Sequence, residues 1–72
     1  MYIQKEELDR LCEEYPVGTR VRLVKMDDVQ APPAGIEGVV RSIDCVGTIH
    51  ISWQNGSGLG AVYGEDVIEK IV

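Results

Sequence analysis

The run 49–59 constrains the fold most, because strict alternation of apolar and polar residues leads directly into a turn sequence. Successive side chains of a strand point to opposite faces of a sheet, so alternate residues share one apolar face. These residues are Ile49, Ile51 and Trp53. Asn55 and Gly56 both tolerate the positive φ of a two-residue type I′ turn, which predicts a β-hairpin. A hairpin is marginally stable alone, so further strands must cover its apolar face.

The first 15 residues predict an amphipathic helix from Ile3 to about Tyr15. Apolar residues recur at spacings of three and four along this segment and share one helix face. They are Leu8, Leu11, Cys12 and Tyr15. Pro16 ends the helix because proline disfavours helical geometry in the residue before it. We therefore expect residues 1–15 to form a helix packed on the rest of the chain or on a partner, and residues 16–72 to form a β-barrel.

The remaining segments predict short strands over 19–26, 36–44, 48–53, 59–63 and a final strand from Val67 or Ile68 to the end. Val21 and Leu23 point inward in the first of these, and a bulge near Arg41 and Ser42 keeps both Val40 and Ile43 in the core. Gly38 indicates a close backbone approach. One helix followed by five short strands is typical of a small five-stranded antiparallel SH3-like barrel, with an OB-type barrel as the alternative.

Composition and length place the chain among soluble globular domains. The 72 residues are 44% hydrophobic and 26% charged, which is neither disordered nor membrane-embedded. No apolar run approaches the roughly 20 residues needed to cross a bilayer. The first residues lack the pattern of a secretory signal, so we expect a cytoplasmic protein. Cys12 and Cys45 are expected as reduced thiols, with a disulfide between them as the alternative.

The charge balance disfavours phosphate-rich partners. Seven basic residues against twelve acidic ones give a net charge of −5, and nucleic-acid and anionic-membrane binding both depend on clustered Lys and Arg. Arg20, Arg22 and Arg41, with Lys25 nearby, form the only candidate basic strip. Two interpretations stay open for it: interspersed solubility residues, or a local contact with RNA or DNA.

Four short motifs occur in order and resemble a known family. They are Tyr15-Pro16-Val17-Gly18-Thr19-Arg20-Val21-Arg22-Leu23, then Met26-Asp27-Asp28 with Pro32-Pro33, then Trp53-Gln54-Asn55-Gly56, and Tyr63-Gly64-Glu65-Asp66. Over about residues 15–71 the chain is similar to small bacterial proteins catalogued as domain of unknown function 4314. The resemblance implies an SH3-like barrel encoded in bacteria and their mobile elements or phages, without an assigned activity. The acidic N-terminal helix lies outside this resemblance.

The sequence offers no catalytic or metal constellation. His50 is the only histidine, and alternation places it on the outer face as a solvated residue without a nucleophile or base partner. The acidic pairs Asp27-Asp28 and Glu65-Asp66 are interpreted as turn residues, with Asp66 as a cap, because a third nearby carboxylate for a cation is missing. We expect a protein that is not an enzyme and that has no cofactor and no metal.

The long loop from Asp27 to Gly35 is the leading candidate for a recognition surface. We expect it to line a shallow groove for a protein or peptide partner together with the 53–55 hairpin. The candidate partner-binding residues are Asp27, Asp28, Pro32, Pro33, Trp53, Gln54, Asn55 and Tyr63. Trp53 has two interpretations, a core residue or a ligand platform. The alternative function is a nucleic-acid-associated accessory domain of a mobile element or phage, and the chain is expected as a monomer or a weak homodimer through the helix.

Overall fold

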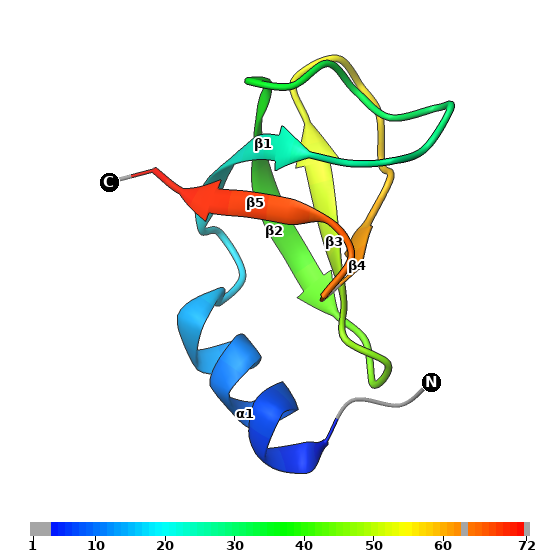
Figure 1. The fold of residues 1–72 in the computed structure, drawn as a ribbon. Helices are drawn as coiled ribbons and strands as arrows, with labels where there is room; N and C mark the ends of the chain where they lie inside the picture. The colour runs from blue at the N-terminus through cyan, green and yellow to red at the C-terminus, as the bar shows by residue number, and fades with distance from the viewer. Residues whose placement is uncertain (1–3, 63, 72) are drawn as a thin grey trace.

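The computed structural model describes residues 4–62 and 64–71. In chain order the elements are α1 (Lys5–Glu14), β1 (Arg20–Lys25), β2 (Glu37–Ile43), β3 (Thr48–Trp53), β4 (Ala61–Val62) and β5 (Val67–Lys70). All strand pairs are antiparallel, and the order across the sheet is β4-β3-β2-β1-β5. The predicted mainly β architecture with one leading helix is therefore confirmed (Figure 1).

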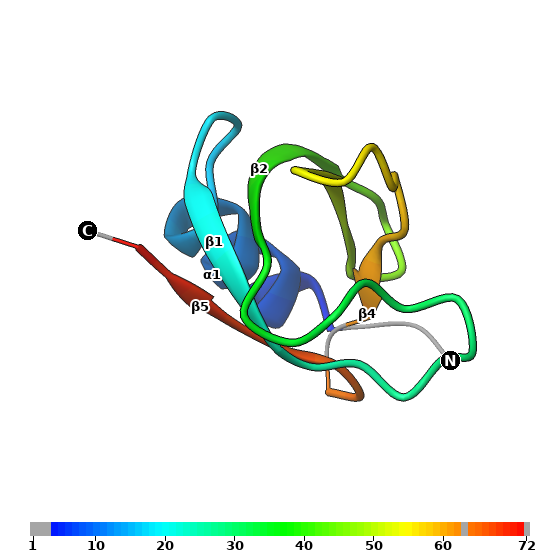
Figure 2. The ribbon, with the colours of Figure 1, turned by 90° about the horizontal axis from the view of Figure 1, so that it is seen from above.

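The sheet is strongly curved but open. Seen from above, β1 and β5 lie on one side and β4 on the other, and β2 curves between them (Figure 2). In the described part of the chain no ladder joins β4 to β5, so the strand pairing establishes a five-stranded antiparallel sheet, the coarser part of the predicted SH3-like barrel. Among the same residues, no helix has the length and apolar character needed to span a membrane.

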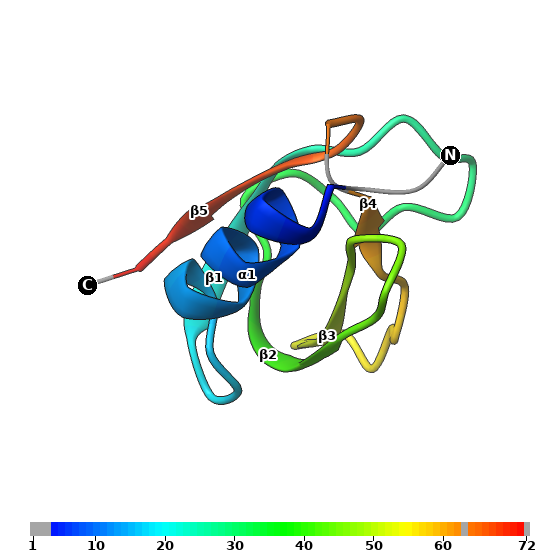
Figure 3. The same cartoon turned by 90° about the horizontal axis from the view of Figure 1, so that it is seen from below.

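The core lies inside this curve and is sealed at one end by α1. The five side chains expected to form the inward wall are all at most 4% exposed: Val21, Leu23, Ile49, Ile51 and Trp53. Leu11 of the helix is 5% exposed and belongs to the same cluster. Figure 3 shows α1 lying across the lower end of the sheet. The helix is therefore packed on the sheet through Leu11. The apolar helix face that the sequence predicts makes this contact within the chain.

Two irregularities of β2 agree with the sequence prediction. The register between β2 and β3 shifts between Val40 and Ser42, which is the predicted bulge. Because of this shift Val40 is fully buried and Ile43 still packs against the core. A β-carbon on Gly38 would lie 2.6 Å from Ile51 Cγ2 and 2.8 Å from Trp53 Cε3, so the strands can approach here only because position 38 is glycine.

The predicted type I′ turn at Asn55-Gly56 is wrong by one residue. Gly56 N–H donates to the carbonyl of Trp53 at 3.0 Å, so Gln54 and Asn55 are the central residues of the turn. Asn55 does not adopt a positive φ, whereas Gly56 has a φ of 86°. A turn of this kind followed by one left-handed glycine is the three-residue hairpin loop. The Asn55 side chain accepts the N–H of Ser57 at 3.0 Å, which stabilises asparagine at this position without a positive φ.

Strand β4 is shorter than the predicted 59–63 strand. The carbonyl of Leu59 accepts the indole N–H of Trp53 at 2.8 Å, and the N–H of Leu59 donates to the Ser57 hydroxyl at 3.3 Å. Both backbone groups of Leu59 are therefore bonded to side chains, and ladder pairing begins only at Ala61. Tyr63, the last residue of the predicted strand, lies outside the described residues.

Candidate functional site

The predicted recognition loop is exposed and organised by its own polar groups. The Asp28 carboxylate accepts the N–H of Gln30 at 2.7 Å, and the Asp28 carbonyl accepts the N–H of Ala31 at 3.1 Å. Asp27 and Pro33 are exposed, whereas Pro32 is buried. Asp28 thus has the turn-forming role typical of aspartate in loops. Among the described residues no group of three or more His, Cys, Asp or Glu side chains could hold a metal ion.

The other predicted site residues are divided between surface and core. The loop 26–36 and the segment 54–60 both lie at the end of the sheet away from α1 (Figure 1). Gln54 and Asn55 are exposed there. Trp53 is 2% exposed, and its indole N–H is bonded to the Leu59 carbonyl, so the core interpretation of Trp53 is the correct one. Tyr63 lies outside the described residues.

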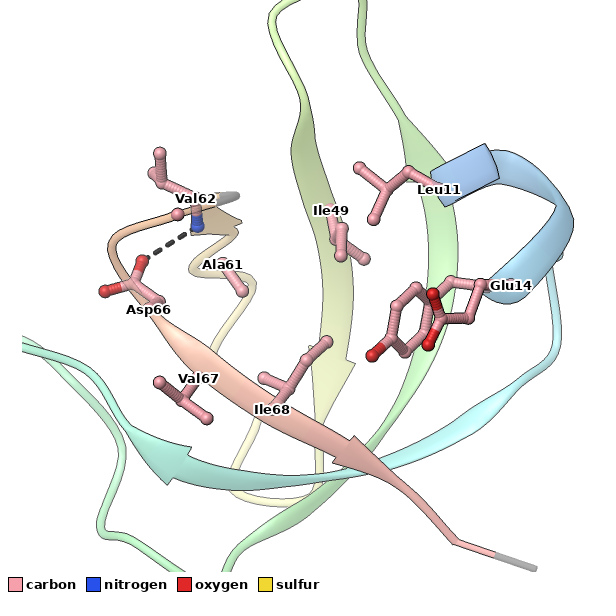
Figure 4. Close-up of a pocket in the computed structure, with 10 residues that line it drawn as sticks. Leu11, Glu14, Ile49, Ala61, Val62, Asp66, Val67 and Ile68 are labelled. Atoms are coloured by element: carbon pink, nitrogen blue, oxygen red, sulfur yellow. Dashed lines mark hydrogen bonds between the residues drawn. The ribbon is translucent and has the colours of Figure 1, made fainter. Parts of the chain in front are cut away.

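A cavity of about 220 Å³ opens at the other end of the sheet, beside the helix (Figure 4). It is surrounded by α1, β3, β4, β5 and the turn before β5, which the sequence prediction did not bring together. Its apolar lining comes from Leu11, Tyr15, Ile49, Ala61, Val62, Val67 and Ile68. Val67 is 46% exposed although it lines this apolar space. Apolar surface at the mouth of a cavity is typical of a binding site.

Two carboxylates flank this cavity. The Oδ2 atom of Asp66 accepts the N–H of Val62 at 2.8 Å, which fixes the turn between β4 and β5 (Figure 4). This turn cap was predicted from the sequence. Glu14, at the last turn of α1, is exposed and lies beside Tyr15. Partial burial, and secondly the charge of Glu14, raise the pKa of the Tyr15 hydroxyl, so Tyr15 stays neutral at physiological pH.

Tyr15 joins the helix end to the last strand. The ammonium group of Lys70 lies 5.7 Å from the centre of the Tyr15 ring, within the range of a cation–π contact. Lys70 and Ile68 lie on the same face of β5, because alternate residues of a strand share a face. Sequence periodicity could not predict this contact because 55 positions separate the two residues.

The outer edge of β5 borders the cavity. The N–H of Ile71 donates to the Arg20 carbonyl at 2.9 Å, so the backbone groups of alternate β5 residues point toward β1. Leu23 lies opposite Ile68 in this pair of strands, but its backbone groups point away from β5. The N–H of Leu23 donates to the Ile36 carbonyl, and the Leu23 carbonyl accepts the N–H of Gly35. The backbone N–H and C=O groups of Ile68 and Lys70 therefore point away from β1, toward the open edge of the sheet.

His50 is not a freely solvated residue as expected. Its Nε2 atom lies 3.0 Å from Oδ2 of Asp44, and both side chains are about half exposed. The Oδ1 atom of Asp44 accepts the N–H groups of Thr48 at 2.9 Å and Val46 at 3.1 Å. The Thr48 hydrogen bond first, and the His50 ring next, hold the pKa of Asp44 below its ordinary value. The arrangement stabilises a turn, and an aspartate at the start of that turn is its sequence signal.

The basic strip is neutralised at two of its positions. Arg20 Nη2 lies 2.8 Å from Glu37 Oε1, and Arg22 Nη1 lies 3.1 Å from Glu69 Oε1. Each pair joins neighbouring strands on the outer face of the sheet. The outer face therefore presents alternating charges rather than a continuous positive surface.

Cys12 and Cys45 are both free and exposed.

One family model matches residues 4–71 of the chain, under the description domain of unknown function (DUF4314). The match extends further toward the N-terminus than the resemblance inferred from motifs, so it also covers α1. No curated protein and no solved structure shows significant similarity to the chain. Because the match covers nearly the whole sequence, the chain belongs to the DUF4314 family.

Proposed function

We propose that this protein is a non-enzymatic binding module for a protein or peptide partner, and that the cavity between α1 and β5 is its binding surface. The observation that carries the proposal is an open apolar cavity of about 220 Å³ beside the outer edge of β5, with which no strand pairs among the described residues. This surface differs from the loop and hairpin groove expected from the sequence, since Trp53 of that groove is buried.

The size of the cavity favours a side chain of a macromolecular partner over a free metabolite. Sites for drug-sized ligands usually have volumes of about 300–1,000 Å³ and contain a small number of polar groups that fix the orientation of the ligand. This cavity is smaller, and one of its two carboxylates, Asp66, is already bonded to the Val62 backbone. A single apolar side chain presented by a larger partner suits such a space.

The contacts of His50 support a non-enzymatic role. The only side chain that its ring contacts within hydrogen-bond distance, among the described residues, is Asp44. The Asp44 carboxylate is itself engaged by two backbone N–H groups of a turn. Nucleophilic catalysis needs a nucleophile within reach of its base, and general acid–base catalysis needs access to a substrate proton. A turn-stabilising pair meets neither requirement.

An SH3-like barrel fold and a cytoplasmic location are part of the same proposal. The strand order, the short connections and the strong curvature of the sheet support an SH3-like barrel (Figure 2). Two free and exposed cysteines suit a reducing compartment such as the cytoplasm. The resemblance to small bacterial and phage proteins supports an origin in a mobile element.

A selection of displayed peptides tests the binding proposal. A phage library of random nine-residue peptides is selected in parallel on the native chain and on the variants Val67→Lys and Val29→Lys. Val67 lines the cavity, and Val29 is a fully exposed valine of the 26–36 loop. We expect enrichment on the native chain and on Val29→Lys, and its loss on Val67→Lys with an unchanged circular dichroism spectrum. No enrichment on the native chain, or equal enrichment on all three proteins, would refute the proposal.

A further inference from the structure

We infer that the partner is an extended, basic peptide segment that adds to β5 as a sixth strand, with one aliphatic side chain in the cavity. This inference rests on the proposed function and specifies how the partner is recognised. It combines three observations that are independent of one another: the direction of the β5 backbone groups, the place of the cavity, and the charge of the flanking helix.

The β5 edge supplies the backbone groups that an added strand requires. Ile68 and Lys70 direct their N–H and C=O groups away from β1, and no strand pairs with them in the described part of the chain. Strand addition is a common mode of peptide recognition, in which main-chain hydrogen bonds supply affinity and pockets select alternate side chains. Two residues of β5 with this direction accommodate about four residues of an added strand.

The cavity supplies the pocket for an alternate side chain. Ile68 points into the cavity from β5, and Leu11 and Ile49 approach it from the helix and from β3 (Figure 4). An added strand would lie about 4.8 Å from β5, directly beside this apolar lining. One of its side chains would enter the cavity, while the next would point to solvent. A branched aliphatic residue fills such a space without a polar group that would need a partner.

The charge around the cavity selects a basic segment. Residues 4–14 contain five acidic residues against two basic ones, and Glu14 lies at the cavity. On the other side, Glu65 and Asp66 form the turn that leads into β5. Lys70 is the one cation of β5, and it is held over the Tyr15 ring. A Lys or Arg beside the aliphatic residue would be attracted to these carboxylates, whereas an acidic peptide would be repelled.

Backbone methylation of a selected peptide tests strand addition. The best peptide from the phage selection is synthesised with a fluorescent label and with single N-methyl groups at each position in turn. Strand addition uses alternate N–H groups, so we expect methylation at alternate positions to weaken binding at least tenfold, and methylation at the intervening positions to change it less than threefold. Uniform sensitivity along the peptide, or a helical peptide in the complex, would overturn the inference.

A proline substitution in the protein also tests strand addition. Lys70→Pro removes an outward N–H while the ladder to β1 uses other residues, and Lys70→Ala removes the side chain alone. Both variants lack the lysine side chain, so we expect Lys70→Pro to bind the peptide at least tenfold more weakly than Lys70→Ala. Equal binding by the two variants would overturn strand addition and leave the cavity proposal intact, because Val67→Lys tests the cavity separately.

Matched helix variants test the charge preference. Glu14→Gln and Glu13→Gln each remove one negative charge from α1, but only Glu14 lines the cavity. We expect about fivefold weaker binding for Glu14→Gln and less than twofold for Glu13→Gln at low salt. Enrichment of acidic peptides in the selection would overturn the inference. So would a peptide-free dimer in sedimentation that Lys70→Pro abolishes, since a second copy would then be the occupant.

Discussion

Gly38 on β2 lies so close to Ile51 on β3 that a β-carbon at position 38 would come within 2.6 Å of the Ile51 Cγ2 atom. The Ser52 carbonyl oxygen would lie only 2.9 Å away, so backbone as well as side chain would have to move. We expect Gly38→Ala to lower the free energy of unfolding by about 1–3 kcal/mol in urea titration. Gly58 has open space around it, and Gly58→Ala should change stability little. Equal midpoints for both variants would contradict this packing.

Helix α1 contributes one buried residue to the core. Leu11 is 5% exposed, while its neighbour Cys12 is exposed. We expect Leu11→Ala to lower the free energy of unfolding by about 2–5 kcal/mol, because it removes buried methyl groups and leaves a void. Cys12→Ala should stay within about 0.5 kcal/mol of the native chain. A neutral effect of Leu11→Ala in the same urea titration would show that the helix does not pack on the sheet.

The turn between β2 and β3 makes the free energy of unfolding dependent on pH. The folded state lowers the pKa of Asp44, so the Asp44 carboxylate binds a proton less readily in the folded chain than in the unfolded chain. The contribution of the Asp44 carboxylate to the free energy of unfolding is therefore complete above the ordinary aspartate pKa of about 4. It is lost as the pH falls through that value and below it. We expect Asp44→Asn to be less stable than the native chain at pH 7, with a difference that shrinks toward pH 3.

Thermal unfolding followed by circular dichroism between pH 3 and pH 7 measures this dependence. Asp27→Asn is the matched control, because it changes an exposed loop carboxylate outside the turn. This control should keep the acid dependence of the native chain. A constant difference between Asp44→Asn and the native chain over the whole range would contradict the role of the ionised carboxylate.

The paired arginines bear on the alternative function as a nucleic-acid-associated domain. Arg20 and Arg22 are within 3.1 Å of Glu37 and Glu69, so little positive charge is left to displace counterions from phosphate. We expect filter binding of a DNA duplex by the native chain to be undetectable at low salt. The double variant Glu37→Gln, Glu69→Gln should gain weak binding that falls as salt rises. Salt-dependent binding by the native chain itself would restore the alternative function.

The sheet could be predicted because its core follows local rules. Alternation placed Val21, Leu23 and the apolar residues of 49–53 on one face, and the structure buries all of them. The bulge in β2 was predictable for the same reason, since Val40 and Ile43 cannot both face inward without it. Gly38 likewise indicated a close approach because glycine is unfavourable inside a strand unless space requires it.

The cavity could not be predicted, because it depends on contacts between distant segments. It forms where the helix end at Tyr15, the short strand β4 and the edge of β5 come together. The periodicity of a single segment does not predict which distant segments lie next to it. The turn at 54–56 was misplaced because the Asn55 side chain accepts the backbone N–H of Ser57, and Asn55 does not adopt a positive φ. That local bond competes with the preference of an Asn-Gly pair for a type I′ turn.

The most direct measurement is a titration of the ¹⁵N-labelled chain with the selected basic peptide, followed by amide chemical shifts. We expect the largest changes at Leu11, Val62, Ile68 and Lys70, which surround the cavity and the β5 edge. Changes concentrated instead in the loop 27–33 and at residues 54–55, with the β5 amides unaffected, would contradict the binding surface proposed for this family member.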